Sequence, residues 1–443
     1  MRWAAAGTLL LAAVARGQVP TPAAASPPRR VLTLEEAVRT AAANQPQLRQ
    51  ARASTQAASA RADESRAPLL PQLTGSGSYQ RLTQNFVSRP GSLPSGVTSG
   101  GGSSWATANY WSYGATLSQL VWDFGQTPGR WRAAEASAES QRESERATGQ
   151  QVLLGARTAY FAARAARDLV GVARETLANQ EAHLRQIQGF VEVGTRPEID
   201  LAQARTDRAN AQVQLINAEN GYETAKAQLN QAMGIEGPTD YEIADDTLPT
   251  VEGEDQSLDV LLGEALRARP ELAALDRQVR AQEATLGAVR GGYLPTLGVS
   301  TGISEAGPAL DATVWNWNAT ATLTWNLFQG GLTRAQAQEA QANLDGATAQ
   351  LASQRQQVRL EVEQARLAVR AAKSALGAAG EALVNARERL RLAEGRYQAG
   401  SGSVIELGDA QVALTTASAQ RVQADYNVAS ARAQLLKALG RSG

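Results

Sequence analysis

The stretch Trp315-Asn-Trp-Asn-Ala-Thr-Ala-Thr-Leu-Thr-Trp-Asn-Leu327 decides the fold, because every second residue in it is apolar. The positions between are all Asn or Thr, so the pattern has a period of two without exception. Such alternation is typical of a β-strand with one apolar and one polar face. The stretch alone fits two settings, a half-buried strand of a soluble sheet and a strand that crosses a membrane.

Tryptophans lie toward both ends of this stretch. From Trp315 to Trp325 a strand would extend for about 33 Å at ~3.3 Å per residue. Tilted by roughly 40°, it would cover about 25 Å, the height of the apolar band of an outer-membrane barrel, which aromatic girdles flank. A second alternating stretch runs from Tyr110 to Trp122. We therefore expect a membrane girdle formed by five residues: Trp111, Trp122, Trp315, Trp317 and Trp325.

The composition excludes several classes of protein. The chain has 443 residues, with 43 basic and 43 acidic side chains, and this balance argues against nucleic-acid binding. It has no cysteine, which excludes disulfides, thiolate chemistry and lipid attachment at cysteine. The one histidine, His183, lies in a polar helical run, where we expect a solvated residue. No nucleophile motif, phosphate loop or metal-ligand cluster is present, and Asp245-Asp246 falls in a linker where solvation is expected. The sequence thus predicts no enzyme, cofactor or metal site.

The N-terminus predicts export. Residues 1–17 combine a basic start, an apolar run of about a dozen residues and a small-x-small end, which is typical of a secretory signal peptide cleaved after Gly17. Residues 18–32 are rich in Pro and Ala and are expected to be a flexible leader. No later apolar run approaches the ~20 residues that span a bilayer as a helix. If the exported protein enters a membrane, we expect it to do so as β-strands.

The rest of the chain is predicted to contain two copies of one plan: helix, strand, strand, long helix, helix. The first repeat, 33–233, has a helix from Thr33 to about Arg66, strands near 73–79 and 110–122 around a loop at 82–108, and helices over 127–193 and 197–233. A linker at 234–256 follows. The second repeat, 257–440, has strands at 296–303 and 315–328 and helices over 332–398 and 403–439. Gly194 and Gly400 are 206 positions apart, as are Gly234 and Gly440 (400 − 194 and 440 − 234), which supports a tandem duplication.

The long helices carry a seven-residue repeat with alanine on one row. The helix over 332–398 has one row of larger apolar residues from Val362 to Tyr397 and a facing row of alanines from Ala365 to Ala393. Strict seven-residue spacing produces a supercoiled seam, and alanine lets two helix axes approach closely. Because only short turns join consecutive long helices, they must form antiparallel hairpins.

Each repeat supplies two strands, so one chain has four. The smallest outer-membrane barrels have about eight strands. An open sheet edge in lipid would leave backbone groups unpaired, at a cost of several kcal/mol each. The chain is therefore predicted to complete a barrel with further copies of itself. Two copies would give eight strands and three would give twelve, and the strands themselves do not choose between these.

Across 33–440 the chain resembles the TolC-like outer membrane efflux proteins. The resemblance rests on the duplication, on strand ends Leu120-Val-Trp-Asp-Phe-Gly-Gln126 and Leu323-Thr-Trp-Asn-Leu-Phe-Gln-Gly330, and on turns Val193-Gly-Thr-Arg-Pro-Glu-Ile-Asp-Leu201 and Ala399-Gly-Ser-Gly-Ser-Val-Ile-Glu-Leu407. It implies a homotrimer in the outer membrane of a Gram-negative bacterium, with a twelve-stranded barrel continued by a periplasmic α-helical tunnel. It also implies a periplasmic adaptor (membrane fusion protein) and an inner-membrane pump as partners, and a passive exit duct for efflux or type I secretion.

The resemblance places a gate at the turns around Gly194 and Gly400, far from the strands. Ser403 and Glu406 form a capping-box pattern, and Asp409 lies one turn further on the same face. Glu406 could simply cap its helix, and Asp409 could simply face solvent. The resemblance instead implies that they form rings of carboxylates at a constriction, which would favour cations. It also matches Tyr397 to a gate tyrosine and Asp200 to its acidic partner. An arginine of the family pattern is replaced by Gly402, while Arg196 occupies the equivalent place in the first repeat, so one closing salt bridge is expected to be missing or rearranged.

The leading hypothesis is thus an outer-membrane exit duct. The alternative is a secreted or periplasmic coiled-coil scaffold, including adaptor-like proteins with a single helical hairpin. The duplication and the tryptophan-flanked strands favour the duct, because a scaffold needs no lipid-facing surface.

Overall fold

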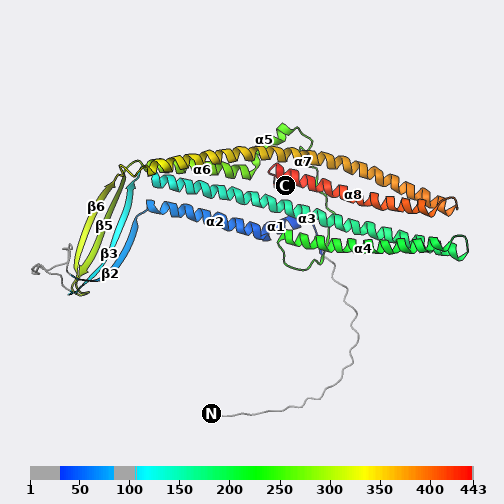
Figure 1. The fold of residues 1–443 in the computed structure, drawn as a ribbon, viewed down its shortest axis with the longest axis horizontal. Coiled ribbons are helices and arrows are strands. Elements are labelled where there is room, and N and C mark those ends of the chain that lie inside the picture. The colour runs from blue at the N-terminus through cyan, green and yellow to red at the C-terminus, as the bar shows by residue number, and fades with distance from the viewer. Residues whose placement is uncertain (1–29, 84–104, 106, 442–443) are drawn as a thin grey trace, which may run out of the picture.

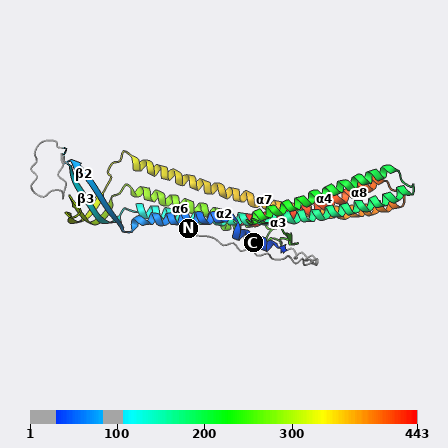
Figure 2. The ribbon, with the colours of Figure 1, turned by 90° about the horizontal axis from the view of Figure 1, so that it is seen from below.

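The computed structural model describes residues 30–83, 105 and 107–441. These residues form a long rod, with a β-sheet at one end and two helical turns at the other (Figure 1). Figure 2 shows the same division after a quarter turn, with the turns that end α3 and α7 side by side at the far end. The predicted signal peptide, the leader up to residue 29 and most of the predicted loop at 82–108 lie outside the described residues.

The sheet contains the four predicted strands and has two free edges. It contains β2 (Gln72–Thr83), β3 (Thr107–Trp122), β5 (Thr296–Gly307) and β6 (Val314–Thr324), all antiparallel, in the order β2-β3-β5-β6. The first three strands extend beyond their predicted bounds, whereas β6 ends at Thr324, so Trp325 lies just past it. The two repeats therefore join through β3 and β5, and β2 and β6 remain at the edges of the sheet.

A bulge at Val121 brings Trp122 to the same face of the sheet as Trp111, Trp315 and Trp317. In β3, Leu120 pairs with Gly298 but Trp122 pairs with Leu297, so one extra residue reverses the alternation of the strand. Trp111 and Trp122 would otherwise face opposite sides of the sheet, because their numbers differ by an odd count. On this apolar face, Trp111, Trp315 and Trp317 lie toward the strand ends that are far from the helices. Trp122 lies at the end that is close to the helices, and Trp325 directly follows β6 at the same end.

The expected single helix from Thr33 to Arg66 is wrong, because proline breaks it. The structure has α1 (Leu34–Asn44), capped by the Thr33 side chain, and α2 (Pro46–Arg66). The second repeat has the same break between α5 (Leu258–Ala268) and α6 (Pro270–Gly291). Proline disfavours the α conformation in the residue before it, and Gln45 and Arg269 are both extended. In both repeats proline starts the next helix, where its missing N–H costs nothing.

The long hairpins match the prediction closely. They are α3 (Gln126–Glu192) with α4 (Glu198–Met233), and α7 (Leu332–Gln398) with α8 (Val404–Ala438). The rows of the heptad seam are largely buried, which confirms the predicted packing. Helix α3 contacts α2 and α6 in its first half and α4 and α8 in its second half, so it runs the length of the rod as a spine. At ~1.5 Å per residue, α3 and α7 are each about 100 Å long.

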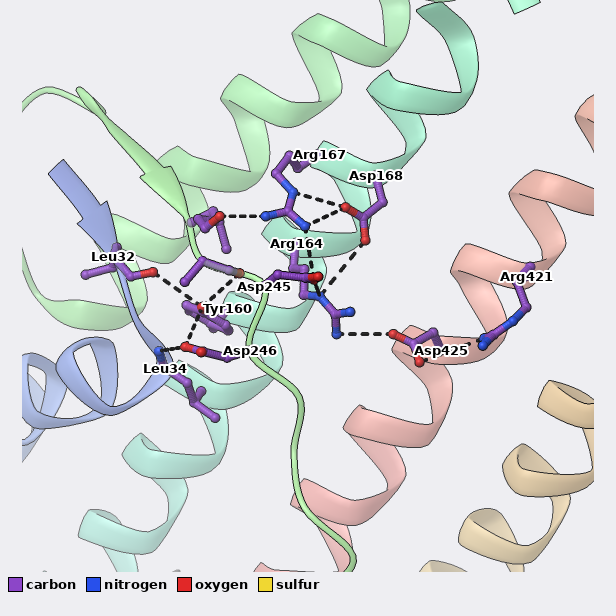
Figure 3. A network of polar contacts seen from close by, with 12 residues as sticks. Leu32, Leu34, Tyr160, Arg164, Arg167, Asp168, Asp245, Asp246, Arg421 and Asp425 are labelled. Carbon is purple, nitrogen blue, oxygen red and sulfur yellow. Dashed lines mark hydrogen bonds and ion pairs between the residues drawn. The ribbon is translucent and has the colours of Figure 1, made fainter. Parts of the chain in front are cut away.

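The linker between the repeats is ordered, and its two adjacent aspartates are bound. Strand β4 (Tyr241–Ile243) pairs in parallel with β1 (Arg30–Leu32), so the end of the predicted leader and part of the predicted linker form a small sheet. Asp246 accepts hydrogen bonds from the Leu34 amide (2.7 Å) and the Tyr160 hydroxyl (3.0 Å). Asp245 is exposed, as expected, but it also binds Arg164 and Arg167, as Figure 3 shows, so the pair is held by partners that the sequence did not predict.

Two arginines tie the linker to both hairpins. Arg164 of α3 binds Asp245 of the linker (2.9 Å) and Asp425 of α8 (3.1 Å) (Figure 3). Further along the linker, Glu254 is 2% exposed and accepts hydrogen bonds from Arg432 of α8 and Lys373 of α7. These two groups of contacts join the linker to both long hairpins in the middle of the rod.

The buried Glu254 carboxylate predicts a pH-dependent contribution to stability. Burial alone would raise its pKa, but hydrogen bonds from Arg432, Lys373 and the Val251 amide outweigh burial and lower the pKa below its usual 4.5. A carboxyl with a lowered pKa stabilises the fold above its unfolded pKa, and that contribution is lost as the pH falls through the folded pKa.

Glu254→Gln should lower the free energy of unfolding by about 3 kcal/mol at neutral pH, because it leaves Arg432 without its buried counter-ion. Thermal unfolding in detergent, followed by circular dichroism, measures the change. Asp255→Asn is the matched control, since Asp255 binds the same Lys373 from an exposed position and should cost less than ~1 kcal/mol. Equal losses in the two variants, or a Glu254→Gln deficit that persists well below pH 4.5, would contradict this account.

Candidate functional site at the far turns of the hairpins

Both hairpins reverse direction through a glycine in the left-handed conformation. Gly194 has φ 71° and Gly400 has φ 75°, values that side chains with a Cβ rarely adopt. In each turn the next residue donates a hydrogen bond back into the helix: Thr195 to the Phe190 carbonyl (2.9 Å) and Ser401 to the Arg396 carbonyl (3.0 Å). This is the Schellman arrangement that ends helices at glycine. The two predicted tip glycines thus have the same backbone role, 206 residues apart.

One apolar cluster joins the two tips. It combines residues of the first hairpin, such as Ile187 and Ala204, with residues of the second, such as Leu390 and Leu407, and all four are buried. Alanine at 204 and 410 lets the helices approach closely, as the seven-residue pattern predicts. The far ends of the hairpins therefore pack as one unit within the chain.

Tyr397 is the aromatic centre of this cluster. Its side chain is only 1% exposed, although it lies in the last turn of α7. The guanidinium of Arg196 lies over its ring, 4.7 Å from the centroid, a cation–π contact that ties the first turn to the second hairpin. The rings of His183 and Phe190 from α3 are 5.6 and 6.3 Å from it. His183 is itself 8% exposed, so the prediction that it is solvated is wrong.

The Tyr397 hydroxyl is buried and has no hydrogen-bond partner among the described residues. Burial raises the pKa of this phenol, Arg196 lowers it and Asp200 raises it, and the net direction is upward. The hydroxyl therefore keeps its proton at neutral pH and is a donor without an acceptor. Asp200, its expected acidic partner, influences the phenol through charge and has no hydrogen bond to it within this chain.

Glu406 is bound within its own hairpin. Ser403 caps α8 by accepting a hydrogen bond from the Glu406 amide (3.1 Å), which is one half of the predicted capping box. The Glu406 carboxylate instead accepts a hydrogen bond from Arg396 of α7 (2.6 Å). Asp409, one turn later, is exposed. The two predicted ring carboxylates thus differ in their partners: Glu406 belongs to an ion pair, whereas Asp409 has no ion pair in the described structure.

Gly402 is buried and fits because it lacks a side chain. Its amide donates to the Arg396 carbonyl (2.9 Å), and a Cβ at this position would lie 2.9 Å from the Tyr397 nitrogen and 3.0 Å from the Arg396 carbonyl carbon. The arginine that the family pattern has here would require the turn to shift. In this chain Arg396, six residues earlier, provides the cation that reaches the start of α8.

A groove of about 730 Å³ runs between α4 and α8 beside this cluster. Asp200 and Asp207 line it from α4, Asp409 from α8 and His183 from α3. Of the predicted gate residues, the structure therefore brings Tyr397 and Arg196 into contact and places Asp200 and Asp409 along one groove. Glu406 is engaged elsewhere, and the five tryptophans lie at the opposite end of the rod.

Sequence reasoning missed three residues of this site: Arg396, Phe190 and His183. A signal for the last two exists, because Ala173, Thr176, Gln180, His183, Ile187 and Phe190 follow a strict 3-4 spacing on α3. Extending the heptad rule to α3 would have placed His183 inside. Arg396 has no such signal, since its contact with Glu406 depends on the geometry of the turn.

In residues 30–83, 105 and 107–441 no group of three or more His, Cys, Asp or Glu side chains could hold a metal ion. No helix of this part of the chain is both long enough and apolar enough to cross a membrane.

The sequence matches the profile of the family described as "Outer membrane efflux protein" over residues 37–235 and 261–441, which is most of the chain. The chain belongs to this family. Outer membrane protein TolC of Escherichia coli (strain K12) is 27% identical over 417 residues, covering 89% of this chain and 79% of that protein. The probable efflux pump outer membrane protein TtgC of Pseudomonas putida is 25% identical over 92% of this chain and 82% of its own length.

Solved structures have the same fold. The Campylobacter jejuni CmeC outer membrane channel superposes with a TM-score of 0.80 at 20% identity, over 92% of this chain and 85% of that one. The Vibrio cholerae outer membrane protein VceC gives 0.79 at 18% identity, over 92% and 96%. Like other outer membrane efflux proteins, this chain is a passive exit channel of the Gram-negative outer membrane and not an enzyme. The predicted fold class and function are confirmed.

Gly402→Ala should loosen the second turn, because the added methyl group would overlap the end of α7 at a cost of about 1–3 kcal/mol. Amide exchange over residues 396–407 should become roughly tenfold faster, since opening of this turn becomes easier. Gly395→Ala is the matched control, because a Cβ at that helical position meets nothing within 4 Å. Unchanged exchange in Gly402→Ala would show that the turn does not need glycine.

Proposed function

We propose that three copies of this chain form one duct: a twelve-stranded barrel in the outer membrane and a helical tunnel across the periplasm. The observation that carries the proposal is the four-stranded sheet with free edges at β2 and β6. In lipid each unpaired edge group would cost several kcal/mol, so the edges must pair with other copies. Three copies give twelve strands and room for a lumen, whereas eight strands enclose an interior that side chains fill.

The two faces of the sheet support this arrangement. Trp122, Trp315, Trp317 and Trp325 are each more than half exposed in the single chain. An exposed apolar face of this size indicates contact with lipid or a partner. The opposite face has small hydroxyl, amide and glycine residues at most positions, including Thr74, Ser76, Ser112, Thr116, Ser300, Ser304, Asn316, Asn318 and Thr320. We assign the tryptophan face to lipid, with a girdle at each rim, and the hydroxyl face to the lumen.

The far turns would then form the periplasmic end of the duct, where a periplasmic adaptor and an inner-membrane pump would dock. A pump as partner is supported by a relative, since TtgC is named a probable efflux pump outer membrane protein. We propose that the tip residues Tyr397, Arg196 and Asp200 hold this end closed. Family membership gives no support to the alternative of a secreted coiled-coil scaffold. The solute carried would be set by the pump.

We propose that Asp409 gives the constriction its preference for cations and that Glu406 contributes little. Glu406 and Arg396 are 2.6 Å apart and together carry no net charge. Three copies of Asp409 around the threefold axis would add three negative charges at one level of the pore. Rings of carboxylates concentrate cations and hinder anions.

Asp409→Asn should therefore reduce cation selectivity, measured as the reversal potential of the purified protein in a planar bilayer under a salt gradient. The matched control removes the neutral pair as a unit, Arg396→Gln with Glu406→Gln, and should leave the reversal potential nearly unchanged. Equal shifts in the two variants would contradict the neutralisation of Glu406. An unchanged reversal potential in Asp409→Asn would show that this residue does not line the constriction.

A further inference from the structure

The one histidine of the chain lies where the two hairpins meet. His183 belongs to α3, is 8% exposed, and has its ring 5.6 Å from that of Tyr397 at the end of α7, tilted by 65°. It is four residues before Ile187 and seven before Phe190, and both of these residues belong to the apolar cluster shared by the hairpins. On its other side it borders the groove between α4 and α8. The imidazole is therefore packed between an aromatic core and a polar groove.

Each element packed against this position contributes a charged or titratable group. The first hairpin contributes Asp200 and Asp207 from α4 and Arg196 from the preceding turn, and the second contributes Asp409 from α8 along the same groove. Tyr397, from α7, is held neutral by burial, which raises the pKa of its phenol. On α3 itself, the neighbouring Glu181 is paired with Arg208 of α4 (3.3 Å). Arg196 already places one cation over the Tyr397 ring.

The surroundings favour the neutral imidazole in this packing. Burial lowers the pKa of His183, and Asp207 and Asp200 raise it only in part, so the net direction is below the usual 6.5. A base with a lowered pKa stabilises the closed packing fully above its unperturbed pKa, and that contribution is lost as the pH falls. If α3 separates from Tyr397, the imidazole becomes hydrated in the groove. The hydrated imidazole binds a proton more tightly than the packed one does. Acid therefore shifts the equilibrium toward that arrangement.

We propose that His183 is a pH sensor at the periplasmic end of the duct, and that its protonation separates the tips of the two hairpins and opens the channel. The proposal rests on the proposed function, because it takes the turns at Gly194 and Gly400 to be the closed end. A protonated ring would be a second cation beside the Tyr397 ring that Arg196 already covers. The groove carboxylates Asp200 and Asp207 would attract it away from this core.

The test compares conduction of the full-length protein in planar bilayers at about pH 7.5 and about pH 5, on either side of the ordinary titration range of histidine. The wild-type open fraction should rise severalfold on acidification. His183→Phe keeps an aromatic ring against Tyr397 but cannot be protonated, and it should stay closed at both values. His183→Gln provides a second neutral variant in case phenylalanine disturbs the packing, and His183→Lys should be open at both values.

Amide exchange over residues 183–201 and 397–410, corrected for its intrinsic pH dependence, gives a readout that does not need conduction. Wild-type tips should lose protection at about pH 5, while tips of His183→Phe should keep it. Equal pH responses of wild type and both neutral variants would overturn the sensor. A protein that conducts under no condition, yet shows the histidine-dependent change in exchange, would instead contradict the duct and leave the pH-dependent packing in place.

Discussion

The structure depends on one constraint, the pairing of backbone groups at the edges of the sheet. A soluble protein can hydrate the free N–H and C=O groups of an edge strand, but a strand facing lipid cannot. The order β2-β3-β5-β6 joins the two repeats at β3 and β5 and leaves the outer edges of β2 and β6 unpaired. Closure with further copies is therefore a condition for insertion. The tandem duplication supplies the four strands that make such closure possible with only three chains.

The second requirement is a connection between the membrane end and the far turns. Helix α3 provides it, since it contacts α2 and α6 near the sheet and α4 and α8 beyond the middle. The linker contacts the hairpins near the middle of α3, where the packing partners of α3 change from α2 and α6 to α4 and α8. Arg164 of α3 binds both the linker and α8, and Glu254 of the linker binds α7 and α8. Because the middle is held by partly buried ion pairs and the tip by an apolar and aromatic cluster beside a polar groove, we expect the tip to open first.

Periodic features of this protein were predictable from its sequence, and features that depend on a single turn or contact were not. The period of two in β6 and the heptads of α7 and α8 determine the strands, the hairpins and the shared seam. The breaks before α2 and α6 are also encoded in the sequence, by Pro46 and Pro270. The Val121 bulge and the Arg396–Glu406 pair follow from local geometry that no spacing encodes. At the candidate site, the gate role of Tyr397 stays a prediction, whereas the burial of His183 contradicts its expected solvation and follows from the 3-4 spacing of α3.

The central claim is that the chain is complete only as a membrane-embedded trimer. The most direct measurement is the mass of the purified full-length protein in lipid nanodiscs, determined by native mass spectrometry or light scattering. The account predicts a particle with three chains, about three times the mass of one chain, that falls apart or aggregates when lipid and detergent are removed. A stable monomer in water without detergent would contradict the account.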